Sequence, residues 1–148
     1  MKRLLNYTII LSLSLVVFGC GGPTIDKDSD EFDYIEVTKK GITNYKGDPF
    51  SGTLVKNYEN GQLEKKVTYK DGKEHSVYET YYKNGQLEWK VTYKDGKLHG
   101  VSESYYEDGQ LEKKVTFKHG ELDGVWEDYD KEGKVSSRRT YKDGIEVK

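Results

Sequence analysis

Polar and apolar residues alternate in short runs over most of the chain beyond residue 50, and the runs are separated by turns that contain glycine. Val101 to Tyr106 and Leu111 to Phe117 are two such runs, and both include β-branched and aromatic residues. A period of two is typical of a β-strand with one covered face. Since no helical periodicity of useful length follows the N-terminal segment, the pattern predicts an all-β protein.

The turns recur at a fixed spacing of 24 residues. Two series of turn glycines share this spacing: Gly61, Gly85, Gly109 and Gly133, and Gly72, Gly96, Gly120 and Gly144. Two interleaved series with one period indicate that a single supersecondary unit has been duplicated. We therefore assign residues 52–148 to tandem 24-residue repeats.

Each repeat is predicted to be a β-hairpin. The central residues of its turn are Asn60-Gly61, Asn84-Gly85, Asp108-Gly109 or Glu132-Gly133. Asn-Gly and Asp-Gly favour a two-residue type I′ turn, in which both central residues have positive φ. Glycine adopts positive φ freely, and Asn or Asp adopt it more readily than other residues. Glu132 therefore marks the weakest turn, and the second connection, such as Lys94 to His99, is expected to be longer.

Two-residue loops would fix which residues lie opposite each other in every hairpin. Counting outward from the turns pairs three acidic residues with basic ones: Glu79 with Lys90, Glu103 with Lys114, and Glu127 with Arg138. Each such pair contributes about 0.2–1 kcal/mol. The same count places mainly apolar pairs on the other face: Tyr58 with Leu63, Leu54 with Val67, Tyr82 with Leu87, Tyr78 with Val91, Thr80 with Trp89, and Tyr106 with Leu111.

A single hairpin is too small to be stable alone. Ordering each residue costs about 1–2 kcal/mol, whereas a buried aliphatic or aromatic side chain returns about 1.5–3 kcal/mol. Neighbouring hairpins must therefore pair into one sheet. The 13 Tyr, four Phe and two Trp residues supply large side chains that can pack along a sheet without a thick second layer. We predict an elongated, single-layer antiparallel meander.

The N-terminal segment has the layout of a secretory signal. Lys2 and Arg3 precede an apolar run from Tyr7 to Phe18 that is too short to span a membrane, and residues 1–19 are assigned to a signal peptide. Val17-Phe18-Gly19-Cys20 resembles the bacterial lipobox, whose cysteine receives acyl chains such as palmitate and becomes the first mature residue. This resemblance implies a lipid attachment site at Cys20, the only cysteine of the chain. An ordinary cleaved signal is the alternative.

The next residues are acidic and contain few apolar side chains. Residues 20–33 include Asp26, Asp28, Asp30, Glu31 and Asp33, and they are predicted to form the lipidated N-terminus and a flexible tether. The acidic stretch resembles the surface-export signal of lipoproteins in some bacterial groups, and Gly21 is not the aspartate that marks inner-membrane retention in others. These resemblances imply the outer membrane or cell surface rather than the inner membrane. Residues 34–51 contain two short strand-like segments around Lys39-Lys40-Gly41 and are predicted to cap the repeats.

Two stretches of the third repeat carry a family resemblance: Asp95-Gly96-Lys97-Leu98-His99-Gly100-Val101 and Tyr105-Tyr106-Glu107-Asp108-Gly109-Gln110-Leu111. They resemble the MORN repeat (membrane occupation and recognition nexus), in the variant form common in bacterial antitoxin-like proteins. The resemblance covers roughly residues 45–144. It implies β-hairpin sheets that act, without catalysis, as scaffolds, dimerisation surfaces or protein-binding modules. Ser76 replaces the glycine found at positions 52, 100 and 124, so the second copy is expected to be the most distorted.

Three functions remain open from the sequence. The leading one is a non-catalytic, lipid-anchored scaffold of the bacterial cell envelope whose repeat sheet binds another protein or itself. The second is an antitoxin or immunity protein that neutralises a toxin, and the third is a glycan or cell-wall binder. A one-layer sheet leaves aromatic side chains partly exposed, and core packing is the alternative role for them. The predicted partner-binding residues are Tyr78, Tyr82, Trp89, Tyr106 and Trp126.

No arrangement typical of an active site is found in the sequence. His75 and His99 are 24 residues apart, His119 falls at a different loop position, and no cysteine accompanies them, so no metal site is predicted. Lys and Glu alternate, and the chain without residues 1–19 has 22 basic and 26 acidic residues, which does not indicate nucleic acid as a partner. No cofactor and no small-molecule substrate are expected.

Overall fold

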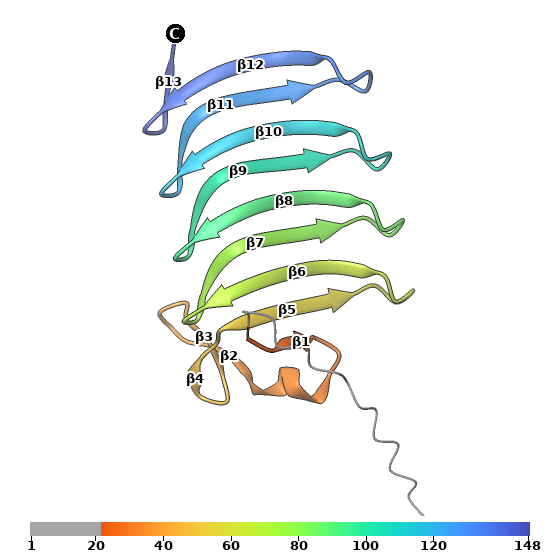
Figure 1. The fold of residues 1–148 in the computed structure, drawn as a ribbon, viewed down its shortest axis with the longest axis vertical. Coiled ribbons are helices and arrows are strands. Elements are labelled where there is room, and N and C mark those ends of the chain that lie inside the picture. The colour runs from red at the N-terminus through yellow and green to blue at the C-terminus, as the bar shows by residue number, and fades with distance from the viewer. Residues whose placement is uncertain (1–21) are drawn as a thin grey trace, which may run out of the picture.

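The structure, a computed structural model, describes residues 22–148, so the predicted signal peptide and Cys20 lie outside the described residues (Figure 1). The described chain forms a ten-stranded sheet with the order β1-β5-β6-β7-β8-β9-β10-β11-β12-β13 and a three-stranded sheet with the order β2-β3-β4. In the large sheet each strand from β5 onward pairs antiparallel with the next one in sequence. The predicted all-β, antiparallel repeat meander is confirmed. No helix of this part of the chain is long and apolar enough to span a membrane.

The repeats stack as successive hairpins of one open, curved sheet (Figure 1). Their strands are β5 (Gly52–Asn57), β6 (Leu63–Lys70), β7 (Lys73–Tyr81), β8 (Leu87–Lys94), β9 (Lys97–Tyr105), β10 (Leu111–Lys118), β11 (Glu121–Tyr129), β12 (Val135–Lys142) and β13 (Ile145–Val147). All turns with Gly61, Gly85, Gly109 and Gly133 lie along one edge, which we call the long-turn edge. The turns with Gly72, Gly96, Gly120 and Gly144 lie along the opposite, short-turn edge.

The predicted type I′ geometry of the Asn-Gly turns is wrong. Gly85 has a φ of 86°, but Asn84 is not among the described residues with positive φ. The Gly85 N–H donates to Tyr82 O at 2.9 Å, and the Tyr82 N–H donates to Gln86 O at 2.8 Å. These bonds define a type I turn followed by a left-handed glycine and a bulge. Asn84 Oδ1 accepts from the Gln86 N–H at 2.9 Å, which stabilises the turn without positive φ at Asn84.

The type I′ turns lie instead at the short-turn edge. Asp95 and Gly96 have φ of 53° and 77°, and Lys94 pairs directly with Lys97, so this loop has two residues. The equivalent loops are Asp71-Gly72, His119-Gly120 and Asp143-Gly144, and all have positive φ at both positions. The expectation of a longer connection here is therefore wrong. Glu132 does not have positive φ, so the reason for predicting that its turn is the weakest no longer applies.

The predicted register is correct except next to the turns. Glu79 lies opposite Lys90, Glu103 opposite Lys114 and Glu127 opposite Arg138, as predicted. Near the long-turn edge Leu87 pairs with Tyr81 instead of Tyr82, and Leu63 and Leu111 shift in the same way. One extra residue in the returning strand, such as Glu88, restores the register beyond the bulge. The predicted charge pairs are therefore correct, although the turn type from which they were counted is wrong.

A second irregularity lies near the short-turn edge, where β7, β9 and β11 shift register against the preceding strand. Each shift contains one residue with positive φ: Ser76 at 68°, Gly100 at 87° and Gly124 at 128°. The second copy therefore keeps the backbone of the others. Ser76, which replaces glycine in this copy, is an L-residue in the left-handed region, and this conformation costs about 1–2 kcal/mol.

The N-terminal cap covers the side of the sheet formed by β5, the first strand of the repeats. It consists of β1 (Thr24–Asp26), which runs parallel to β5, a 3-10 helix η1 (Asp30–Tyr34), and the small sheet of β2 (Ile35–Val37), β3 (Thr43–Tyr45) and β4 (Asp48–Pro49). Ile25 is 1% exposed and Phe50 is 2% exposed. Burial of Ile25 explains why residues 24–33 are folded where the sequence predicted a flexible tether. The two predicted strands around Lys39-Lys40-Gly41 are confirmed as β2 and β3.

The best-buried positions of the repeats lie on one face of the sheet. Val67, Val91 and Val115 are at most 5% exposed and occupy equivalent places in successive repeats. They belong to a row of directly paired residues across the sheet: Leu54, Val67, Tyr78, Val91, Ser102, Val115, Trp126 and Arg139. The valines alternate with larger residues except at Ser102, which accepts a hydrogen bond from the Trp89 indole. Neighbouring side chains therefore cover the valines, although in residues 22–148 no second sheet packs on this face.

Candidate functional site

The predicted partner-binding residues occupy two different zones of the sheet. Tyr78, Trp89 and Trp126 lie on the face that carries the valines, which we call the aromatic face. Tyr82 and Tyr106 follow the strands at the long-turn edge. All five side chains are half-buried. The structure therefore brings the residues together as two clusters and a row along the edge, not as one stripe.

The first cluster surrounds Tyr78 at the centre of the aromatic face. Its ring centroid lies 5.2 Å from that of Trp89, in an edge-to-face arrangement, and 6.2 Å from that of Tyr93. The Trp89 Nε1–H donates to Ser102 Oγ at 2.9 Å, and the Lys65 ammonium lies 4.9 Å from the Tyr78 centroid. Such ring pairs contribute about 0.5–1.5 kcal/mol beyond their burial. The cluster is a rigid, amphipathic surface, because each indole or phenol has a packed neighbour.

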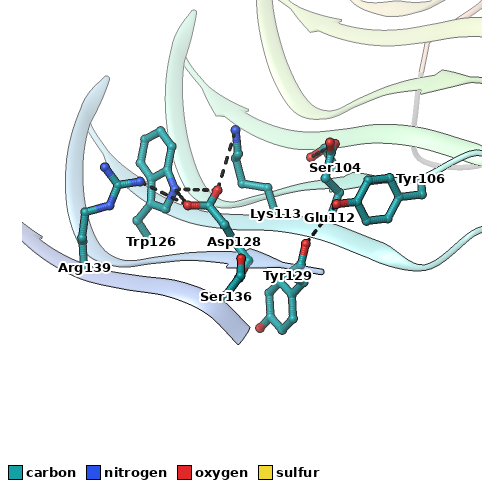
Figure 2. A network of polar contacts seen from close by, with 9 residues as sticks. All are labelled: Ser104, Tyr106, Glu112, Lys113, Trp126, Asp128, Tyr129, Ser136 and Arg139. Atoms are coloured by element: carbon teal, nitrogen blue, oxygen red, sulfur yellow. Dashed lines mark hydrogen bonds and ion pairs between the residues drawn. The ribbon is translucent and has the colours of Figure 1, made fainter. Parts of the chain in front are cut away.

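The second cluster surrounds Trp126, two repeats further along (Figure 2). Its Nε1–H donates to both carboxylate oxygens of Asp128 at 3.0 Å, and Arg139 Nη2 donates to Asp128 Oδ2 at 3.2 Å. The guanidinium of Arg139 lies 4.7 Å and the ammonium of Lys113 lies 5.2 Å from the indole centroid. Cation–π contacts and the shared carboxylate hold the indole in place. The aromatic face is thus less apolar here than the sequence predicted.

The tyrosines of the long-turn edge connect one repeat to the next. Tyr58 Oη donates to Tyr81 O at 2.6 Å, and Tyr82 Oη donates to Tyr105 O at 2.7 Å. Tyr106 repeats the contact with Tyr129 O at 3.0 Å. The predicted pairs of Tyr58, Tyr82 and Tyr106 with Leu63, Leu87 and Leu111 are wrong, because these tyrosines belong to the turns. Their 24-residue spacing was the signal that could have identified this row.

The opposite face carries a regular row of charges. The directly paired residues are Lys66, Glu79, Lys90, Glu103, Lys114, Glu127 and Arg138. Glu103 Oε1 lies 3.6 Å from Lys114 Nζ, and Glu103 Oε2 accepts a hydrogen bond from Tyr105 Oη at 3.0 Å. Burial, followed by the neighbouring Glu103 carboxylate, raises the pKa of Tyr105. Its phenol therefore stays protonated as the donor to Glu103.

The histidines lie near the short-turn edge. The rings of His99 and His119 are 5.4 Å apart, although they differ in loop position, while His75 Nδ1 lies 3.6 Å from Asp95 Oδ1. This proximity was missed because His119 occupies a turn place that holds Asp71, Asp95 and Asp143 in the other repeats. Within residues 22–148 no group of three or more His, Cys, Asp or Glu side chains is arranged to hold a metal ion.

Comparison with protein families agrees with the repeat period. The family model described as "MORN repeat variant" matches residues 51–71, 74–95, 98–119 and 122–143. Each match spans the hairpin of one repeat. A comparison with curated proteins found no match. Since the four matches cover more than half of the 148 residues, the chain belongs to the MORN repeat variant family.

Proposed function

We propose that this protein is a non-catalytic scaffold of the bacterial cell envelope that binds a protein partner, either another chain or a second copy, through the aromatic face. The observation that carries the proposal is the pair of rigid, half-buried clusters around Tyr78 and Trp126 on a face without a second layer over β7 to β12. Trp, Tyr and Arg are the residue types that dominate binding energy at protein interfaces.

The arrangement favours surface contact over chemistry. The aromatic side chains are immobilised by Ser102, Asp128 and Arg139, so little side-chain entropy is lost on binding. The opposite face pairs its charges internally in repeated Glu–Lys contacts, which are worth little at a solvated surface. The aromatic face is therefore the stronger candidate for the contact surface.

The test compares one aromatic residue from each face. Trp89→Ala removes the indole between Tyr78 and Ser102, whereas Tyr105→Ala removes a half-buried ring beside Glu103 on the opposite face. Truncation of a central interface aromatic costs about 2 kcal/mol or more, which is roughly a thirtyfold loss of affinity. We expect Trp89→Ala alone to reduce self-association in sedimentation velocity or partner recovery from detergent-solubilised envelope.

Circular dichroism decides how the result is interpreted. If Trp89→Ala unfolds the sheet, the residue is core and Trp126→Ala takes its place in the experiment. If both tryptophan variants remain folded and bind fully, while Tyr105→Ala does not bind, the contact surface is the charged face.

We also propose that acyl chains on Cys20 anchor the scaffold to the outer membrane or cell surface. Only Gly21, Gly22 and Pro23 separate Cys20 from β1, which is paired to the first hairpin. The anchor would therefore hold the N-terminal end of the sheet at the bilayer, with the later repeats projecting outward. Cys20→Ala is expected to release the protein from membranes after a salt wash, and retention in the membrane fraction would contradict the anchor.

A further inference from the structure

A cleft of about 350 Å³ lies between the N-terminal cap and the first hairpin, on the aromatic face. Phe32 of η1 lines it from the cap, and β5 and β6 contribute Leu54, Val67 and Tyr69. Its volume lies at the lower end of the range found for small-molecule sites. The apolar part of the cleft therefore has room for a small ligand.

The sequence explains why the cleft occurs in the first repeat. Leu54 occupies the place that Tyr78, Ser102 and Trp126 occupy in the later repeats, 24, 48 and 72 residues further along. Ser102 is smaller than leucine, but it is buried and accepts a hydrogen bond from the Trp89 indole. Leucine is shorter than either aromatic residue and leaves space above Val67. The cap adds Phe32 as a further wall, and in the described part of the chain no later repeat has a second element over this face.

The charges around the cleft are unbalanced. Its charged lining residues are Lys27, Lys56, Glu64 and Lys65. Lys56 and Glu64 form an ion pair and neutralise each other. Within residues 22–148 neither Lys27 nor Lys65 forms an ion pair with a carboxylate, and the Lys65 ammonium lies 4.9 Å from the centroid of the Tyr78 ring. Two cationic groups beside an apolar cavity complement an anion with an apolar body.

The rim of the cleft is held in place by the folded cap. The Lys27 N–H donates to Val55 O at 2.9 Å, and Asn57 Nδ2 donates to Asp26 Oδ2 at 2.7 Å. Asp26 Oδ1 also accepts from the Asp28 N–H at 2.9 Å. Because these bonds fix the segment that carries Lys27 to β5, the site is largely preformed, which reduces the entropy lost on binding.

We propose that this cleft binds a free medium-chain carboxylate, with the acyl chain against Phe32, Leu54 and Val67 and the carboxylate at Lys27 and Lys65. The inference concerns a small-molecule site and goes beyond the proposed protein scaffold. Charge-assisted hydrogen bonds from the two ammonium groups supply the selectivity for an anion, and the apolar wall selects against small hydrophilic acids.

Isothermal titration calorimetry of the full chain with decanoate, below the concentration at which decanoate aggregates, tests the proposal. We expect one saturable site, and at least tenfold weaker binding of the uncharged analogue decanol. Lys27→Gln and Lys65→Gln should each lower the affinity for decanoate by roughly tenfold. Lys113→Gln is the matched control, because Lys113 is the equivalent of Lys65 two repeats later and lies outside the cleft.

Leu54→Trp provides an independent test, because it places in the first repeat the side chain that the fourth repeat holds at Trp126. It should fill the cleft and abolish decanoate binding while the protein remains folded. If Leu54→Trp does not fold, the two lysine variants still decide. Equal binding of decanol and decanoate, or equal affinity of Lys27→Gln, Lys65→Gln and Lys113→Gln, would overturn the proposal. Binding to phosphatidylglycerol vesicles without binding of free decanoate would overturn it as well.

Discussion

The two edges of the repeat sheet connect neighbouring repeats by different means. At the short-turn edge the backbone makes the contact: the Gly96 N–H donates to Glu74 O at 2.9 Å and the Gly120 N–H to Leu98 O at 2.8 Å, one repeat back. At the long-turn edge a side chain makes it, because Tyr82 Oη donates to Tyr105 O, one repeat forward. The contacts between repeats at the short-turn edge therefore depend on backbone conformation, whereas those at the long-turn edge depend on which side chain is present.

The largest loss of stability is expected for a substitution at Gly72, in the turn of the short-turn edge that contacts the cap. A Cβ on Gly72 would lie 2.3 Å from Ile42 Cγ2 and 2.8 Å from Thr43 O, whereas a Cβ on Gly96 would lie 3.7 Å from its nearest neighbour, Lys73 Cβ. Gly72→Ala adds overpacking to the cost of positive φ and should lower the free energy of unfolding by about 3 kcal/mol. Gly96→Ala should cost about 1 kcal/mol. Urea denaturation measures both, and equal values would mean that the cap does not depend on this turn.

The next test separates the two turn types. Asp95→Val places a β-branched residue at a φ of 53°, which should cost about 2 kcal/mol. Asp108→Val at the long-turn edge meets no positive φ and loses mainly the hydrogen bond from the Gln110 N–H to Asp108 Oδ1, which is worth about 1 kcal/mol. Thermal unfolding compares the variants. A larger loss at Asp108 would contradict the assignment of type I′ turns to the short-turn edge.

Replacement of Ser76, near the short-turn edge, by glycine is expected to stabilise the protein. Ser76 has a φ of 68° where the equivalent Gly100 has 87°, and a Cβ at Gly100 would find its nearest atom, Thr92 Cβ, at 3.8 Å. Because this is an ordinary van der Waals distance without a clash, backbone conformation dominates the cost. Ser76→Gly should raise the free energy of unfolding by about 1 kcal/mol, and Gly100→Ser should lower it by a similar amount. If both variants lose stability, the Ser76 side chain has a packing role that outweighs its φ.

The smallest effect is expected in the charge row midway between the two edges. Glu103→Lys places a lysine opposite Lys114 and should lower the free energy of unfolding by about 0.5 kcal/mol at low salt. Adding Lys114→Glu should restore only part of this loss, because the new lysine still faces Lys90 and the new glutamate faces Glu127. The coupling between the two substitutions should shrink in high salt. A double-mutant cycle in urea measures the coupling. Zero coupling at low salt would mean that the row contributes nothing to the register.

The sequence allowed the period, the open antiparallel meander and most of the register to be predicted, because 24-residue spacing and strand alternation are local properties. Turn type was assigned to the wrong edge. The Asn84-Gly85 dipeptide is compatible with both a type I′ turn and a type I turn with a bulge. The bonds of Tyr82 Oη and Asn84 Nδ2 to the next repeat accompany the second geometry, and an isolated dipeptide does not contain that information.

The cap and the candidate binding clusters were less predictable. Ile25 is one apolar residue in an acidic segment, and only the first hairpin gives it a place to be buried. Tyr78 and Trp89 were correctly placed on one face, since strand alternation determines the face. The network of Trp126, Asp128 and Arg139 joins three residues of paired strands through side-chain conformations, which spacing alone does not specify.

In residues 22–148 the strands of each repeat pair only with each other and with those of a neighbouring repeat or the cap, and this has a consequence for folding. The bond from Tyr82 Oη to Tyr105 O spans 23 residues, as do the equivalent bonds of Tyr58 and Tyr106. Proteins with local contacts fold faster than β-proteins whose strands pair over long distances. A chain that emerges N-terminus first, from the ribosome or across a membrane, can dock each new hairpin onto one already formed, which limits the time during which unpaired strands are exposed.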